Sequence, residues 1–231
     1  MERIKDTLEA SGYVVMAVLL QGGFVVVSAV SLTLLDVSAM SPVSVVVLIG
    51  AAEVPFAIIA YLYFYNSSAQ LLTEEVTKSS TTYILIAPLL ALVVGVGFTL
   101  LFQELGFSGR PFLKGQEVVS KETRIALVFL SILVIGPAEE YFFRGGLQAV
   151  LRESFGLIGT VGVASVLFLL VHVPNVTEAK LPIALASLSG VFAFSLLAGF
   201  AYEKTQSLMV PIIMHGAYNA VIFSLPLFVS L

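Results

Sequence analysis

The sequence predicts an all-α membrane protein, a polytopic transmembrane helical bundle of seven to eight spans. Hydrophobic residues make up 58% of the 231 residues, charged residues only 11%, and the mean hydropathy is +1.04. A soluble domain carries about 25% charged residues, so this chain lacks the polar residues that a water-facing surface needs. Apolar runs long enough to cross about 30 Å of hydrocarbon recur along the chain.

The apolar runs define seven candidate spans, and an eighth would follow if a long run divides or a re-entrant segment is present. Backbone groups in lipid must be hydrogen-bonded within their own segment, and no run alternates as a barrel strand would. Each span is therefore expected to be a helix. The candidate spans are residues 13–35, 43–65, 83–102, 125–143, 157–173, 182–202 and 208–229.

The first run follows Arg3 and Lys5, as the apolar part of a signal peptide would. It is longer than the roughly 7–15 residues expected there, and no A-x-A cleavage site closes it. We interpret it as the first span of a single integral membrane domain, residues 1–231. This multi-pass protein is expected in the bilayer, the cell membrane if it is prokaryotic.

Two polar stretches interrupt the apolar pattern, residues 66–82 and 103–124, and the second could include a short interfacial helix. The 11 Lys and Arg residues divide almost evenly between the two sides, so the positive-inside rule sets no orientation. No internal repeat is visible, which disfavours the inverted-repeat transporters.

Composition also excludes several function classes. The net charge is −4 and there is no basic patch, so nucleic acid is not an expected partner. The absence of cysteine excludes disulfides, a cysteine nucleophile and thiolate metal sites. No G-x-S-x-G or phosphate-binding loop is present.

Polar residues inside spans are costly and are functional candidates by default. The sequence holds four such places. They are the stretch 136–146 with Glu139, Glu140 and Arg144; the stretch 168–172 with His172; the stretch 215–219 with His215 and Asn219; and Glu53 in the second span.

The adjacent glutamates are expected to have different partners. Glu140 and Arg144 are four residues apart, so they share a helix face and can form an ion pair. Glu139 points roughly a quarter turn away and is left for another partner, which suits a general acid/base. The alternative is that both glutamates sit at a helix end in the headgroup region.

The length of the fourth span decides whether Glu139 can meet His172. If the helix continues past Arg144 to about residue 152 and turns back, the two side chains reach the same depth. If it stops at residue 143, they lie at opposite faces of the membrane. Gly145 and Gly146 mark a weak point there, although glycine is also a packing residue in membrane helices.

His215 and Asn219 are four residues apart on one helix face, so both can donate to a developing oxyanion. Alternatively, they form a hydrogen bond that holds helices together. His172 precedes Val173 and Pro174 near a helix end, where an interfacial histidine is the simpler interpretation. In combination, the polar positions favour a functional site.

No cofactor is required by this pattern. A metal ion is compatible with two histidines and a glutamate, but no zincin motif is present and the ligands would come from three spans. Glu53 precedes Val54 and Pro55 in the middle of its span. It is expected either to line a cavity or to pair with a cation from another helix.

In this order, the residues resemble the CPBP superfamily, which contains the type II CAAX prenyl endopeptidases and the Abi proteins of bacteriocin processing and immunity. The resemblance extends from about residue 136 to 219, within a motif-bearing part of about 122–229. It rests on Glu-Glu-x-x-x-Arg at 139, 140 and 144, Phe-x-x-x-His at 168 and 172, and His-x-x-x-Asn at 215 and 219.

The resemblance implies an intramembrane endopeptidase with its active site in a cavity among helices. Glu139 would activate a water with help from His172, while His215 and Asn219 would stabilise the oxyanion. The substrate would be a peptide or a prenylated protein, and family members of the CAAX branch remove the last three residues. The alternatives are a non-catalytic immunity or scaffold protein, a transporter-like protein, and a metal-dependent membrane hydrolase.

Overall fold

A computed structural model describes residues 2–38, 41–66, 71–107, 120–177 and 179–228. Within these ranges the chain is helical, apart from turns, short connections and one isolated bridge between Thr73 and Ser207. The predicted all-α bundle is confirmed. Six helices of the described part are long and apolar enough to cross a membrane, and Met209–Leu225 adds a shorter apolar helix.

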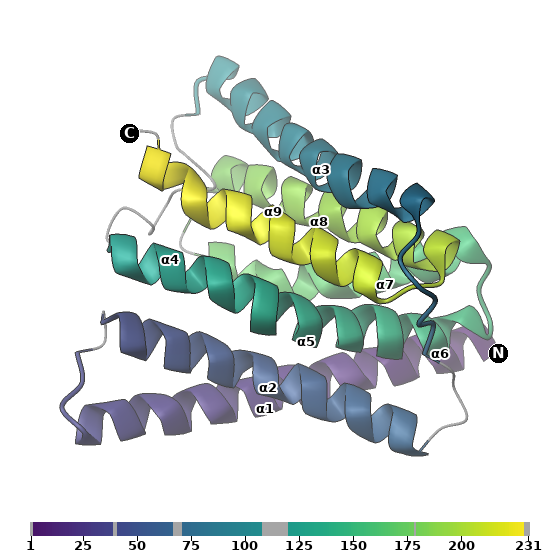
Figure 1. Ribbon diagram of the computed structural model, residues 1–231, viewed down its shortest axis with the longest axis horizontal. Coiled ribbons are helices and arrows are strands. Elements are labelled where there is room, and N and C mark those ends of the chain that lie inside the picture. The colour runs from purple at the N-terminus through teal and green to yellow at the C-terminus, as the bar shows by residue number, and fades with distance from the viewer. Residues whose placement is uncertain (1, 39–40, 67–70, 108–119, 178, 229–231) are drawn as a thin grey trace.

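In the described part of the chain, the six long apolar helices and the shorter Met209–Leu225 helix cross the molecule in alternating directions (Figure 1). The first three are α1 (Glu2–Leu34), α2 (Pro42–Asn66) and α3 (Lys78–Glu104). The fourth segment joins α4 (Lys121–Leu130), η2 (Ser131–Ile135), α5 (Gly136–Glu140), η3 (Tyr141–Leu147) and α6 (Gln148–Arg152). The remaining elements are α7 (Leu157–His172), η4 (Val173–Val176), α8 (Leu181–Thr205) and α9 (Met209–Phe228).

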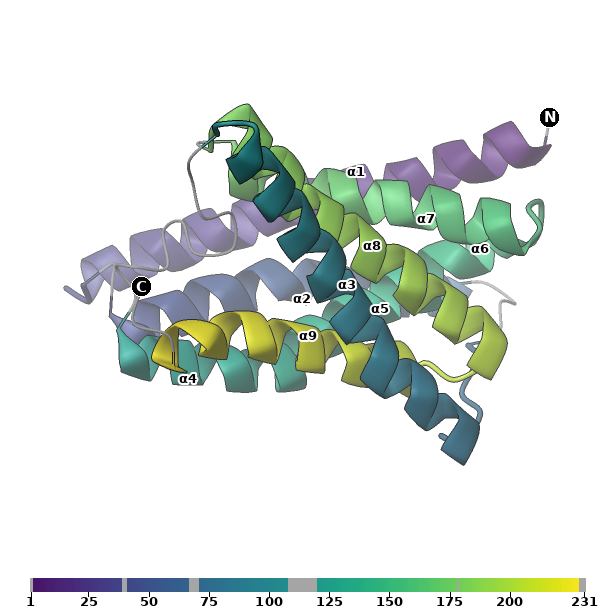
Figure 2. The ribbon, with the colours of Figure 1, turned by 90° about the horizontal axis from the view of Figure 1, so that it is seen from above.

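The fourth segment lies in the middle of the bundle. It packs against α2 on one side and against α9 on the other. Helices α1 and α2 form a pair at one side of the molecule, at the bottom of Figure 1. At the other side α3 packs along α8 and also contacts α9, as Figure 2 shows from above. The later part of the segment, residues 138–151, is therefore almost entirely buried, whereas Phe129 and Leu133 in its earlier part are exposed.

The fourth segment continues to Arg152, so the expected end of this span at residue 143 is wrong. Gly145 and Gly146 are buried within η3 and do not interrupt the helical path. A break among packed apolar helices would leave backbone groups without hydrogen bonds, which costs several kcal/mol for each group. A glycine kept inside a helix costs only about 1 kcal/mol relative to alanine, so the continuous helix is favoured. The longer of the two predicted alternatives is therefore the one observed.

The helix boundaries follow from local capping residues. Thr77 and Ser80 form a reciprocal capping box at the start of α3, and the Ser120 side chain accepts a hydrogen bond from the Thr123 amide at the start of α4. Gln206 ends α8 in the left-handed conformation. The interfacial helix expected within 103–124 falls largely on residues 108–119, outside the described residues.

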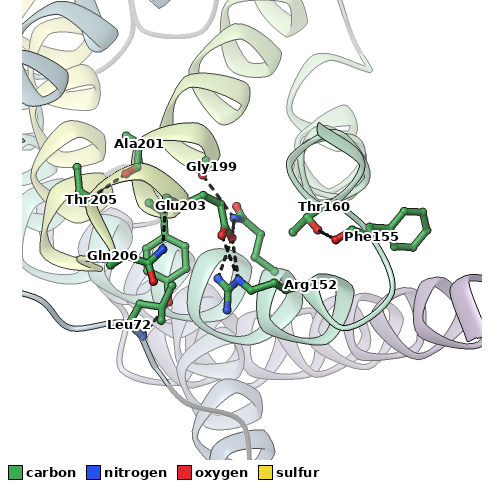
Figure 3. A network of polar contacts seen from close by, with 11 residues as sticks. Leu72, Arg152, Phe155, Thr160, Gly199, Ala201, Glu203, Thr205 and Gln206 are labelled. Atoms are coloured by element: carbon green, nitrogen blue, oxygen red, sulfur yellow. Dashed lines mark hydrogen bonds and ion pairs between the residues drawn. The ribbon is translucent and has the colours of Figure 1, made fainter. Parts of the chain in front are cut away.

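A polar cluster fixes the end of the fourth segment against α8 (Figure 3). Arg152 Nη2 lies 2.7 Å from Glu203 Oε1, and the Gln148 side-chain amide donates to the same oxygen at 2.8 Å. The Leu72 amide donates to the Tyr202 hydroxyl at 3.2 Å. These contacts join α6, α8 and the strand-like segment before α3 at one end of the bundle.

Aromatic rings fill the space between the central helices. Phe143 packs edge-on against Phe168 with 4.8 Å between ring centres, and Phe56 packs on Phe143 at 5.7 Å. All three side chains are buried. This cluster connects α2, the fourth segment and α7 at the level where the polar motifs lie.

Candidate active site

The two glutamates lie in a short α-helical stretch bounded by π-helical turns. η2 precedes α5, and η3 follows it. π turns are rare and occur frequently at functional sites, because the extra residue changes the direction of neighbouring side chains. Glu139 is 6% exposed and Glu140 is fully buried, in the middle of a 32-residue helical segment. This placement contradicts the alternative that both sit at a helix end in the headgroup region.

The predicted ion pair between Glu140 and Arg144 is confirmed. Arg144 Nε donates to Glu140 Oε2 at 2.8 Å, and neither side chain is exposed. Arg144 Nη2 also donates to Ser195 Oγ at 3.1 Å, and the guanidinium lies 5.2 Å from the centre of the Phe168 ring. Arg144 therefore links the fourth segment to α8 as well as to its own helix.

The second oxygen of Glu140 bonds to a histidine on another helix. His215 Nδ1 lies 2.7 Å from Glu140 Oε1. Because Arg144 neutralises Glu140 as a carboxylate, this oxygen accepts and His215 Nδ1 donates. The contact fixes the orientation of the imidazole, whose Nε2 is directed toward Glu139.

Glu139 lies between the two histidines of the chain. Its Oε2 is 3.9 Å from His172 Nε2 and 4.0 Å from His215 Nε2. Distances of this size are spanned by one bridging water rather than by a direct hydrogen bond. The same oxygen has no hydrogen-bond partner among the described residues. A single water molecule can therefore bridge the Glu139 carboxylate to either imidazole.

The His172 ring is held by its own helix. Nδ1 lies 2.9 Å from the Phe168 carbonyl oxygen, and the ring stacks on Phe168 with 4.5 Å between centres. A carbonyl oxygen only accepts, so Nδ1 carries the hydrogen. In neutral His172, Nε2 is therefore a free acceptor that faces Glu139, which is the arrangement expected of an imidazole that assists a base.

Two glycines bring α5 and α9 into close contact. A Cβ added at Gly136 would lie 3.0 Å from the Ser131 carbonyl oxygen, and 3.3 Å from that of Ile212 on α9. A Cβ at Gly216 would lie 3.2 Å from Ile132 Cα. Because neither position has room for a side chain, the helix backbones approach closely, and this brings His215 within reach of both glutamates.

A cavity of about 280 Å³ lies beside these residues. It is found where α7 ends, α8 begins and α9 passes, and His172 and His215 both line it. Most of its other lining residues are apolar or aromatic, including Phe168 and Phe194. A small apolar cavity with a few convergent polar groups is typical of a ligand site.

Asn219 also lines the cavity, one helical turn beyond His215. The prediction that these two residues share a face is confirmed. Tyr218 lines the cavity beside them, and its ring stacks on Phe194 at 4.9 Å. Its hydroxyl is buried and has no hydrogen-bond partner among the described residues, so its donor is not used within them.

Glu53 is buried on α2, 6% exposed, and its Oε2 has no hydrogen-bond partner among the described residues. It is not one of the residues that line the cavity. Among the described residues, the charged group that acts on Glu53 is Glu139, and no ion pair joins Glu53 to a cation.

Ser195 is the site residue that sequence reasoning missed. It accepts the Arg144 hydrogen bond and is fully buried. A serine in an apolar span is common in membrane helices, where small residues let helices approach. Its position therefore carried no distinctive signal. In the described ranges no three His, Cys, Asp or Glu side chains form a group that could hold a metal ion.

Comparison with known protein families assigns this region. Residues 121–221 match the family model described as type II CAAX prenyl endopeptidase Rce1-like. This part of the chain is therefore similar to the type II CAAX prenyl endopeptidases. The matched CAAX protease segment begins with the fourth segment and ends within α9, so it contains both glutamates, both histidines and Asn219.

The remaining comparisons add no relative. Neither the curated proteins nor the solved structures that were compared with the chain gave a match. The CAAX protease segment and the six candidate spans together make this an integral, multi-pass membrane protein.

Proposed function

We propose that this protein is an intramembrane endopeptidase in which Glu139 activates a water for attack on a peptide bond. One observation carries the proposal. Glu139 Oε2 lies 3.9 and 4.0 Å from the Nε2 atoms of two histidines that line one cavity. A general base acts on a substrate either directly or through one water, and these distances suit the second case.

The first step forms the bond between the water oxygen and the carbonyl carbon. A water bridging Glu139 and His172 donates one hydrogen bond to each, because both present acceptors toward it. Glu139 takes a proton from the water as the oxygen attacks. His172, whose Nδ1 is committed to the Phe168 carbonyl, orients the water. General-base assistance of this kind contributes about 10²- to 10⁴-fold to rate.

The carbonyl oxygen becomes an oxyanion in this step. His215, protonated and held through Nδ1 by Glu140, presents Nε2–H, and the Asn219 amide adds a second donor one turn along α9. Removal of one such donor typically reduces kcat by about 10²- to 10³-fold. Collapse of the intermediate breaks the C–N bond, and Glu139 returns its proton to the leaving amine.

The substrate class follows from the family and from the site's surroundings. The CAAX protease segment favours a peptide whose end carries a prenyl chain, and the aromatic cavity wall is compatible with an apolar group. Removal of the C-terminal tripeptide of such a substrate is the specific reaction that we propose. The chemistry needs no metal ion in this scheme.

The test uses purified protein in lipid nanodiscs and a farnesylated CAAX peptide, with tripeptide release measured by mass spectrometry. Wild type is compared with Glu139→Gln, with and without a chelator. Glu153→Gln, an exposed position in the turn after the fourth segment, is the matched control. A peptide of the same sequence without the prenyl group tests whether prenylation is needed.

We expect cleavage by wild type and by the control, unchanged by the chelator, and none by Glu139→Gln. Full activity in Glu139→Gln would overturn the role of that residue. Loss of activity on chelation, restored by one divalent ion, would replace the proposal with a metal-dependent hydrolase. If no peptide is cleaved and the family's prenylated substrates only bind, the protein is a non-catalytic member.

A further inference from the structure

Glu53 is the only charged residue between positions 37 and 73, and it lies inside α2. It is 6% exposed, and its Oε2 has no hydrogen-bond partner among the described residues. A buried polar atom without a partner costs about 1–3 kcal/mol, so its retention needs a physical reason. The mechanism proposed above does not use this residue.

The packing of α2 places Glu53 at the level of Glu139. Helix α2 and the fourth segment run in the same direction and contact each other (Figure 1). Phe56 packs against Phe142 with 5.1 Å between ring centres. Glu53 precedes Phe56 by three residues, and Glu139 precedes Phe142 by three residues. Because the two helices are parallel, both glutamates lie the same distance from the ring contact. The two carboxyl groups therefore share a level and interact electrostatically.

Among the described residues, α1 and α4, which both pack against α2, place no cation at the level of Glu53. On α1, which also packs against α2, no charged residue occurs between Glu9 and Asp36. The charged residues of α4 are Lys121, Glu122 and Arg124 at its start, and Arg124 is 15 residues, or about 22 Å, before Glu139.

The cation of the fourth segment that is closest to Glu139 in the sequence already donates to two other groups. Arg144 is bonded to Glu140 and Ser195. Glu139 has the protonated His215 within 4.0 Å to balance its charge, whereas the charged neighbour of Glu53 among the described residues is Glu139 itself. Two adjacent buried carboxyl groups do not both ionise, because like charges repel strongly where water is excluded.

We propose that Glu53 is an uncharged carboxylic acid at neutral pH and donates its O–H to the Glu139 carboxylate. This hydrogen bond orients Glu139 so that its other lone pairs face His172 and His215. Glu53 is thus a positioning residue, and its importance for cleavage rests on the proposed function of Glu139. The pair holds one proton between its two carboxyl groups, and the imidazoles near Glu139 leave that proton on Glu53.

The first experiment compares two substitutions of Glu53 in the farnesylated-peptide assay. Glu53→Gln keeps the size and a hydrogen-bond donor, while Glu53→Met keeps the size and removes the donor. We expect Glu53→Gln to retain most of the wild-type activity, and Glu53→Met to lose about 10- to 100-fold in kcat with little change in KM. Thermal unfolding and gel filtration of both variants check that the fold is retained.

The pH profile separates this role from simple packing. Loss of the shared proton at high pH would place a second negative charge beside Glu139 and reduce activity in wild type. Glutamine cannot lose a proton in this way, so the contribution of Glu53 to the alkaline limb should disappear in Glu53→Gln. The limb that remains in this variant is that of His215, which must keep its proton to donate through Nε2. Glu53→Met with wild-type activity, or Glu53→Gln as inactive as Glu53→Met, would overturn the proposal.

A second measurement does not depend on catalysis. A protonated carboxylic acid gives a carbonyl stretching band in the infrared spectrum that a carboxylate lacks. The wild-type spectrum at neutral pH should contain such a band, and the band should be absent in Glu53→Gln. Absence of the band from the wild-type spectrum, or its persistence in Glu53→Gln, would refute the assignment of the proton to Glu53. This result stands whether or not any peptide is cleaved.

Discussion

His215 Nδ1 lies 2.7 Å from Glu140 Oε1, although the two residues are 75 positions apart in the sequence. The hydrogen bond joins α9 to the centre of the fourth segment. Because Nδ1 is bonded to Glu140, His215 can interact with a substrate or with Glu139 only through Nε2. This atom lies 4.0 Å from Glu139 Oε2. The adjacent glutamates therefore differ in role. Glu140 fixes the orientation of the His215 ring, and Glu139 lies between the rings of His172 and His215.

Substitution of Arg144 should destabilise the protein strongly. Arg144→Met removes the cation from a fully buried pair and leaves Glu140 with only His215 to balance it. Breaking a buried ion pair by removing one partner costs about 3–5 kcal/mol. Thermal unfolding in detergent, compared with wild type, measures this loss.

Ser195→Ala is the matched control for that measurement. It removes one hydrogen bond to the same guanidinium without removing a charge, which should cost only about 1 kcal/mol. If Arg144→Met and Ser195→Ala are equally stable, the ion pair contributes less than its burial indicates and the interpretation of Glu140 as a structural anchor is wrong.

An added methyl group at Gly136 should separate α5 from α9. In Gly136→Ala the new Cβ would meet backbone atoms of Ser131 and Ile212 at 3.0 and 3.3 Å, and backbone cannot move aside as a flexible side chain can. We expect a loss of about 1–3 kcal/mol in stability. Activity should fall as well, because the distance between Glu139 and His215 depends on this contact.

Gly97→Ala provides the comparison for the glycine prediction. Apart from the backbone of its own helix, no heavy atom of the described residues lies within 4 Å of a Cβ at Gly97, which is on α3. Alanine is the better helix former by about 1 kcal/mol, so the stability should stay the same or rise. Equal losses of stability in both variants would show that helix packing at Gly136 is not the cause.

Tyr218→Phe should separate stability from activity. The buried hydroxyl has no hydrogen-bond partner among the described residues and lies on the cavity wall beside Asn219. Its removal should leave the stability unchanged or raise it by about 1 kcal/mol. If the hydroxyl bonds to bound substrate, kcat/KM in the peptide assay should fall by about tenfold. A clear loss of stability would instead reveal a structural partner.

The ion pair between Arg152 and Glu203 should show energetic coupling. Arg152 Nη2 and Glu203 Oε1 are 2.7 Å apart, and the arginine is one third exposed. A double-mutant cycle of Arg152→Met and Glu203→Gln should give a coupling of about 1 kcal/mol, within the range for residues in direct contact. Unfolding of the four proteins provides the measurement. Strict additivity would mean that the pair does not stabilise the end of the bundle.

Much of the fold could be predicted because hydrophobicity and helix geometry are local properties. The expected span 83–102 lies within α3, and the expected span 182–202 lies within α8. The ion pair of Glu140 and Arg144 followed from their spacing of four residues on one helix. The span 125–143 was too short, because Gly145 and Gly146 suggest a break that packing of η3 against α2 and α7 prevents.

The sequence by itself determined that this is a helical membrane protein and which polar residues stand in its apolar spans. Those properties follow from composition and from the 3.6-residue helical repeat. Only the tertiary structure decided that His215 forms a hydrogen bond with Glu140 and that Ser195 accepts one from Arg144. It also decided that the carboxyl groups of Glu53 and Glu139 interact. These contacts join residues 51 to 86 positions apart, and their formation depends on how whole helices pack rather than on any local pattern.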